Sequence, residues 1–110
     1  MIDWYVIEYL YPESYKKFCE VMFPNVGVIT PSILNNYDLK KLFQFFDNNG
    51  VFLNIEKCYQ NQWIYHIIIE NGLGKTNVYA NGIKTTRNEI EIDGFIECFK
   101  LLDKKIRSQS

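Results

Sequence analysis

The sequence predicts an α+β fold in which helices pack on one face of an antiparallel sheet. Three strand-like runs follow one another between residues 51 and 80, and short polar turns separate them. A helix pattern precedes these runs, and a long amphipathic helix follows them. At 110 residues the chain is long enough for one hydrophobic core. With a strand and a helix expected before this core, the predicted element order is β-α-α-β-β-β-α in two layers.

An N-terminal strand is predicted over residues 2–10, because this run is rich in tryptophan, tyrosine, valine and isoleucine. Alternation along a strand would place Tyr5 and Tyr9 on one face and Trp4 on the other. A strand here would either close one edge of the sheet or offer that edge to a partner.

The next predicted element is a helix over residues 12–23, since a proline suits the first helical turn and apolar residues recur at helical spacing after it. A loop is expected at residues 25–32. We interpret residues 1–37 as a strand–helix–loop extension of an αβββα core at residues 38–106, within a single domain of residues 1–110.

The core is predicted to begin with a helix at residues 38–48, where apolar residues recur at i, i+3, i+4 and i+7. Asn35 or Asn36 is the expected cap at its start. The Asn49-Gly50 pair then supplies a left-handed stop.

Three strands are expected next, at residues 51–58, 63–70 and 76–80. These runs are rich in the β-branched and aromatic residues that favour strands. The turns between them are short, so that neighbouring strands should pair antiparallel.

The final helix carries the clearest local signals. Thr86 and Glu89 form a capping box, in which each side chain satisfies a backbone donor of the other residue. Apolar residues line one side as far as Ile106, and charged residues line the opposite side. Acidic residues open the helix and basic residues close it, which suits the helix dipole.

Composition limits the function classes. The chain has 12 basic and 13 acidic residues, a net charge of −1 and 47% hydrophobic residues. This balance indicates a folded protein without the concentrated positive charge that attracts a duplex or an anionic membrane. No apolar run approaches a membrane span, and the start lacks a signal-peptide pattern, so that a soluble, intracellular, non-secreted protein is expected.

The three cysteines, Cys19, Cys58 and Cys98, are far apart and odd in number. Disulfide frameworks and thiolate zinc sites use paired, closely spaced cysteines. We therefore expect three free thiols in a reducing compartment, with no metal and no cofactor.

Two motifs suggest chemistry but lack what that chemistry requires. Lys75 lies in a Gly-Lys-Thr run that ends like a phosphate-binding loop, yet residue 69 is isoleucine instead of glycine and a strand is expected after the run. His66 is the single histidine. A nucleophile pair with Cys58 across the hairpin stays open, but it would need an orienting third group that the sequence does not specify. The prediction is that the protein is not an enzyme.

The element order over residues 38–102, the element lengths and the capping Thr86 resemble a double-stranded-RNA-binding domain. That family binds phosphates through a basic cluster at the start of its final helix. Of the five residues that directly follow the cap, at positions 87–91, Arg87 is the one base, and both Glu89 and Glu91 are acidic. The resemblance therefore implies the scaffold and argues against inherited RNA binding.

Three runs of the chain carry a second resemblance. They are Trp-Tyr-Val-Ile-Glu-Tyr from Trp4, Leu-Phe-Gln-Phe-Phe-Asp from Leu42 and Thr-Thr-Arg-Asn-Glu from Thr85. With these runs the chain resembles a group of small uncharacterised proteins from tailed bacteriophages, particularly the crAss-like phages of gut bacteria. The group has no established activity, so that the resemblance implies only a phage accessory or virion-associated role, in the host cytoplasm or the virion.

These observations predict a non-catalytic protein–protein interaction module, with a protein partner or self-association and no small-molecule substrate. Tyrosine and tryptophan concentrate at interfaces. The candidate contact residues are Trp4, Tyr5, Tyr9, Tyr11, Trp63 and Tyr65. For most of them, filling the core and its rim is the alternative. The alternative functions are a host-directed inhibitor and nucleic-acid binding, which the charge balance disfavours and which would use the sheet or Lys75, Lys84 and Arg87.

Overall fold

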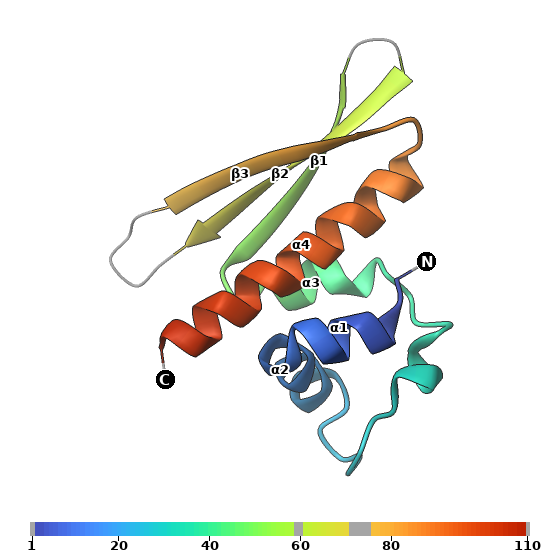
Figure 1. Cartoon of the computed structure of the whole chain (residues 1–110), viewed down its shortest axis with the longest axis vertical. Coiled ribbons are helices and arrows are strands. Elements are labelled where there is room, and N and C mark those ends of the chain that lie inside the picture. Colours follow the sequence, from blue (N-terminus) through green and yellow to red (C-terminus); the bar gives the residue numbers. More distant parts are fainter. Residues whose placement is uncertain (1, 59–60, 71–75, 110) are drawn as a thin grey trace.

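A three-stranded antiparallel sheet and four α-helices make up the part of the chain that the structure describes. This computed structural model describes residues 2–58, 61–70 and 76–109, and for residues 76–82 it describes the backbone alone. The elements in chain order are α1 (Trp4–Leu10), α2 (Pro12–Met22), the short 3₁₀ helix η1 (Pro31–Leu34), α3 (Lys41–Asp47), β1 (Val51–Cys58), β2 (Gln62–Glu70), β3 (Thr76–Lys84) and α4 (Arg87–Ser108). The predicted α+β class is confirmed (Figure 1).

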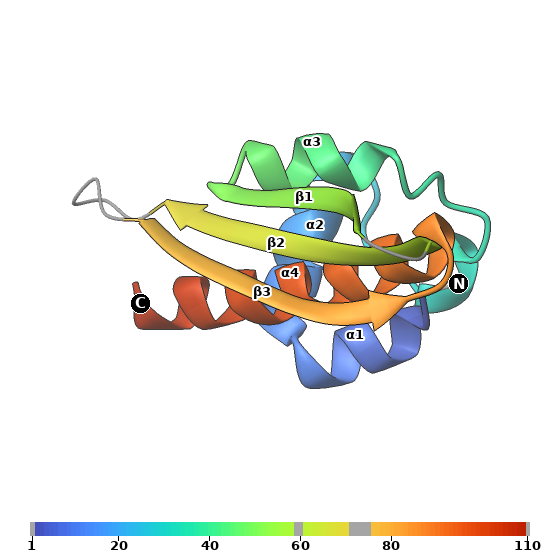
Figure 2. The ribbon, with the colours of Figure 1, turned by 90° about the horizontal axis from the view of Figure 1, so that it is seen from above.

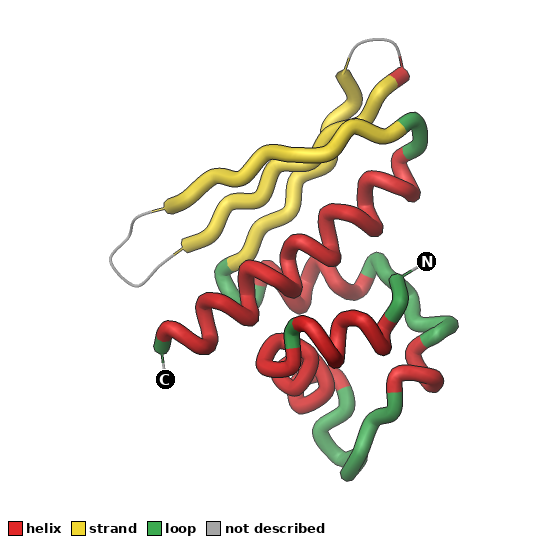
Figure 3. The backbone as a smooth tube through the Cα atoms, viewed as in Figure 1, coloured by secondary structure: helices red, strands yellow, loops and turns green. Residues whose placement is uncertain are grey.

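The helices form two layers beneath one face of the sheet (Figures 1 and 3). α4 packs against all three strands, and α3 packs against β1. α1 and α2 pack on α4 from the side that faces away from the sheet (Figure 1). The fold therefore has three layers, the sheet and two layers of helices, where two layers were predicted. In the part of the chain that the structure describes, no helix covers the other face of the sheet (Figure 2).

The strands pair in the order β1-β2-β3, antiparallel as predicted. Val51 lies opposite Ile69 at one end of the β1–β2 ladder, and Cys58 lies opposite Gln62 at the other. Alternate residues of β1 and β2 face the helices, and the most buried of these are Val51, Leu53, Tyr65, Ile67 and Ile69. The sheet therefore buries one face in the core, as expected for an antiparallel sheet covered from one side.

The predicted N-terminal strand is wrong, because this segment forms helix α1. Asp3 caps the helix, with its Oδ1 accepting hydrogen bonds from the backbone N–H groups of Tyr5 and Val6 at 3.1 and 3.4 Å. Trp4 and Ile7, three residues apart, are buried in the core. Burial of these two side chains outweighs the strand preference of the run. The segment consequently lies in the helical layers and pairs with neither edge of the sheet.

Other boundaries also differ from the prediction. α3 begins at Lys41 instead of residue 38, and neither predicted asparagine caps it. The predicted loop contains η1. β3 extends to Lys84 instead of ending at residue 80. The stop before β1 is confirmed, since Gly50 has a φ of 74°, in the left-handed region that favours glycine.

A cluster of aromatic rings joins all four helices. Trp4 of α1 stacks on Phe18 of α2 with ring centroids 5.0 Å apart, and it lies edge-on to Phe99 of α4 at 5.5 Å. Phe45 of α3 contacts both phenylalanines, with centroids 5.4 Å from Phe18 and 6.3 Å from Phe99. Each such pair adds about 0.5–1.5 kcal/mol to the stability gained from burial. The rings therefore fix α1 and α2 on α4.

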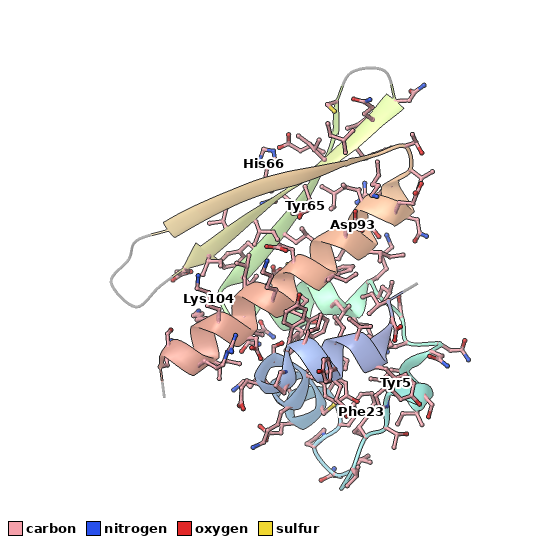
Figure 4. The ribbon with its side chains drawn as sticks, in the orientation of Figure 1. Tyr5, Phe23, Tyr65, His66, Asp93 and Lys104 are labelled. Carbon is pink, nitrogen blue, oxygen red and sulfur yellow. The ribbon has the colours of Figure 1, made fainter. Side chains whose placement is uncertain are left out.

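Tyr65 of β2 lies between the sheet and α4 (Figure 4). Burial raises its pKa to about 12, and the negative charges of Glu97 and Asp93 on α4 add to the effect. The neutral phenol is thus the form that the folded protein favours.

We expect Ile7→Ala to lower the free energy of unfolding by about 2–5 kcal/mol, because it empties a buried site. Val6→Ala should change it by less than about 0.5 kcal/mol, because Val6 lies on the exposed side of α1. Urea unfolding of both variants measures the difference. In a strand, Val6 would share the face of the buried Trp4, so that a large loss in Val6→Ala would contradict the helix.

Stability should fall as the pH rises above 10, the ordinary tyrosine pKa, toward the raised pKa of Tyr65 near 12. In this window the unfolded chain releases a proton that the folded protein retains, which favours unfolding by up to about 1.4 kcal/mol per pH unit. Denaturant unfolding at a series of alkaline pH values should show a shallower decline for Tyr65→Phe. An equal decline in both proteins would refute the assignment.

Candidate functional site

The outer side of α1 exposes four apolar or aromatic residues, which we call the α1 surface. They are Tyr5, Val6, Tyr9 and Leu10, with exposed fractions of 58%, 42%, 84% and 50%. At about 100° per residue they cover about 140° of the helix circumference. The opposite side carries the buried Trp4 and Ile7. α1 is therefore anchored by one face and presents an apolar face to solvent.

A buried carboxylate on α4 holds the start of α2. Asp103 is fully buried, and its Oδ1 accepts hydrogen bonds from the backbone N–H groups of Glu13 at 2.7 Å and Ser14 at 3.1 Å. Its Oδ2 lies 3.0 Å from Nε of Arg107. The residue before α2 gives no side-chain cap, so that Asp103 satisfies the free N–H groups of this helix from a distant part of the chain. This contact helps to position α1, which leads directly into α2.

A groove of about 430 Å³ lies beside α1, between α2 and the loop that follows α2. Its apolar lining includes Tyr15, Cys19 and Phe23, and Glu8 of α1 also lines it. The Tyr15 hydroxyl donates a buried hydrogen bond of 2.9 Å to the carbonyl oxygen of Ile29. Because this bond ties the loop to α2, the groove is formed before any partner binds.

Burial dominates the titration of the groove residues. It is the largest cause that raises the pKa of Tyr15, and the nearby Cys19, Glu8 and Tyr5 add to it. Burial also raises the pKa of the Cys19 thiol, although a hydrogen bond with Tyr15 acts in the opposite direction. A thiol with a raised pKa stays protonated at neutral pH and is a weak nucleophile. The groove therefore suits apolar contact better than nucleophilic chemistry.

Unpaired acidic side chains border this region. Glu8, Glu13 and Glu20 are exposed, and none of them forms an ion pair with another described residue. Residues 2–23 contain these three acids and one further acid against two lysines, which gives a net charge of −2. The α1 surface and the groove thus lie in an acidic part of the molecule.

A second cluster, at one end of the sheet, gathers cations around Trp63. The strand register places Lys57, Trp63 and Lys84 in one row across the three strands. Nζ of Lys57 and Cζ of Arg87 lie 5.9 and 5.6 Å from the Trp63 ring centroid, within cation–π range. Arg87 also contacts Glu91 at 2.8 Å, and an aspartate of α4 lies 3.5 Å from Lys84. The structure therefore brings two predicted nucleic-acid contacts together, but acids offset both of them.

Four of the six predicted contact residues do not form an exposed surface. Trp4 and Tyr65 are buried, with exposed fractions of 2% and 5%. Tyr11 and Trp63 are half-buried. Tyr11 is the residue that joins α1 to α2, and Trp63 lies in the cation cluster. Filling the core and its rim, the alternative raised for these residues, describes all four: Trp4 and Tyr65 lie in the core, and Tyr11 and Trp63 pack against its edge.

Tyr5 and Tyr9 are the predicted contact residues that lie together and exposed. Figure 4 shows Tyr5 at the end of the molecule remote from the sheet. The sequence prediction misses Val6 and Leu10, because strand alternation separates them from the tyrosines. The signal that could have found them is Asp3, a good N-cap directly before the run, together with the helical spacing of its most apolar residues.

The structure separates the residues proposed for nucleophilic chemistry. His66 lies opposite Asn54 and Cys58 lies opposite Gln62, so that His66 and Cys58 are four residues apart along the ladder, about 13 Å. His66 points away from the helices (Figure 4), with its Nε2 3.9 Å from a carboxylate oxygen of Glu56. A direct Cys58–His66 pair is therefore excluded.

The Gly-Lys-Thr run gains no support from the geometry. Lys75 lies outside the described residues, and the strand β3 begins at Thr76, where a phosphate-binding loop would need a helix. Among the described residues, no group of three His, Cys, Asp or Glu side chains is placed to hold a metal ion. Likewise, none of the described helices has the length and apolar character needed to cross a membrane.

Comparisons with protein-family models, with curated proteins and with solved structures find no match. The resemblances to the double-stranded-RNA-binding domain and to the tailed-phage proteins therefore stay predictions. The support for a contact surface therefore comes from the geometry of this chain.

We expect Asp103→Ala to lower the free energy of unfolding by about 2–3 kcal/mol, because the N–H groups of Glu13 and Ser14, the latter buried, lose a charged acceptor. Asp93→Ala is the matched control on the same helix. Asp93 pairs with Lys84 at a partly exposed position, and its removal should cost less than about 1 kcal/mol. Urea unfolding compares the two variants, and equal losses would contradict the role of Asp103.

Proposed function

We propose that the protein is a non-catalytic protein–protein interaction module that contacts its partner through the α1 surface. The observation that supports this proposal is the exposure of Tyr5, Val6, Tyr9 and Leu10 on one side of a helix whose other side is anchored in the core. Following the resemblance to tailed-phage proteins, we assign the module an accessory or virion-associated role, in the host cytoplasm or the virion. A host protein as partner would make it a host-directed inhibitor.

The α1 surface has the chemistry of a binding hot spot. Contiguous exposed apolar patches on a folded protein mark interaction sites more often than scattered single residues do. Tyrosine combines a large apolar ring with a hydroxyl that can hydrogen-bond at the interface rim, and it is enriched among residues that dominate binding energy. Tyr9, with 84% of its surface exposed, contributes little to the core. A partner is therefore the most direct source of stabilisation for this side chain.

The α1 surface is too small to act alone. A seven-residue helix is about 10 Å long, whereas a standard interface buries about 800 Å² on each partner. The adjoining groove between α2 and its following loop extends the apolar area next to α1. The proposed contact surface is therefore the α1 surface together with this groove.

The double variant Tyr5→Ser/Tyr9→Ser should lose at least 100-fold in affinity for the native partner, about 3 kcal/mol, as expected for two central aromatic contacts. It should keep the wild-type free energy of unfolding within about 0.5 kcal/mol, because both side chains are exposed. The measurement is quantitative pull-down from native lysate with tagged wild-type and variant proteins, followed by mass spectrometry.

The control is Ile83→Ser, which removes an exposed apolar side chain (64%) from β3, outside the α1 surface. It should capture the same partner as the wild type. Light scattering behind a sizing column gives the mass of each protein and reveals self-association. A monomer whose captured proteins are unchanged by the tyrosine substitutions would refute the proposal.

A further inference from the structure

We infer that the partner presents a basic amphipathic helix, rather than a second copy of this chain. The inference rests on the proposed function and deepens it, because it names the chemistry of the segment that covers the α1 surface. Two features of the molecule lead to it: the acids that border the surface, and the preformed apolar groove beside it.

The acids supply the charge complementarity. α1 and its cap carry Asp3 and Glu8, and residues 2–15 contain no lysine or arginine. Around the helix, Glu8 lies next to Tyr5, at the edge of the α1 surface. It also lines the groove, so that it lies between the α1 surface and the groove. Its carboxylate forms no ion pair with a described residue. A lysine or arginine of the partner would therefore find an unpaired carboxylate at the centre of the contact.

Glu20 places a second carboxylate on the same groove, on α2. Lys16 also lines the groove, so that the two acids outnumber the one base there. A partner segment with bases on the flanks of an apolar stripe would match this arrangement, with its apolar residues on Tyr5 and Tyr9 and one of them in the groove. Helical spacing of i, i+3, i+4 and i+7 supplies such a stripe.

The same charges argue against a second copy of the chain as the occupant. In a two-fold dimer through α1, the surface would meet itself, and the acids of one helix would face the acids of the other. Residues 2–15 contain no base, and Lys16 is the one base among the groove-lining residues, against Glu8 and Glu20, so that it could not compensate all the acids. Like charges opposed at an interface disfavour that pairing. An anionic membrane is disfavoured for the same reason.

The test uses three synthetic peptides of about 15 residues, long enough to form a helix. All share a leucine stripe at helical spacing, and their polar positions are all lysine, all glutamine or all glutamate. Fluorescence anisotropy of labelled peptide gives the affinity of each for the full-length protein. We expect the lysine peptide to bind most tightly and the glutamate peptide not to bind. Raising the salt concentration should weaken binding of the lysine peptide, because the contact is partly electrostatic.

Matched variants locate the contact. Glu8→Gln and Glu20→Gln keep the side-chain size and should each weaken the lysine peptide about three-fold, whereas the exposed Glu70→Gln at the end of β2 should leave its affinity unchanged. Tyr5→Ser/Tyr9→Ser should weaken both the lysine and the glutamine peptides. Circular dichroism of each variant verifies that the fold is kept.

Three results would overturn the inference, and they bear differently on the proposed function. If the glutamine peptide binds as tightly as the lysine peptide and the tyrosine variant loses both, the partner is not basic while the α1 surface remains a binding site. If none of the peptides binds and light scattering shows a dimer that the tyrosine variant dissociates, the occupant is a second copy. The inference would also be overturned if neither the glutamate nor the tyrosine substitutions weakened binding of the lysine peptide.

Discussion

The packing of rings around Phe99 is the interaction on which the helical layers depend. Phe99 lies in the middle of α4, between the sheet and the α1–α2 pair, and it contacts Trp4, Phe18, Phe45 and Phe46. These rings come from all four helices, so that one cluster joins segments from both ends of the chain. Asp103, one turn further along α4, adds a directional contact by capping α2. Together they make α4 a central helix buried on two sides.

This central helix determines what remains free for binding. α1 satisfies its packing with Trp4 and Ile7, and its cap with Asp3, so that its outer residues are not needed for folding. Because α1 is already anchored in the core, a partner that covers its exposed tyrosines does not have to order their backbone. The groove beside α1 is likewise held in shape by the bond from Tyr15 to Ile29. The residues of the α1 surface are thus distinct from the residues that anchor α1 in the core, and the surface is held in place before a partner binds.

Local signals in the sequence were sufficient for much of the core but not for the candidate site. The Thr86–Glu89 capping box, the stop at Gly50 and the short turns between strands act over a few residues, and the structure confirms the elements that they mark. Residues 2–10 carry a composition that suits a strand equally well, and their helix is decided by contacts with residues more than ten positions away. The α1 surface was therefore only half predicted, through Tyr5 and Tyr9.

By itself the sequence determined the α+β class, the antiparallel order of three strands and the start of the last helix, because periodicity, turn residues and caps act locally. Only the tertiary structure decided that the first segment is a helix, that Trp4 and Tyr65 are buried while Tyr5 and Tyr9 are exposed, and that Lys84 and Arg87 meet acids beside Trp63. Which side of an ambiguous segment faces the core depends on the free energy of burying it against distant residues, and that free energy is not encoded in local spacing.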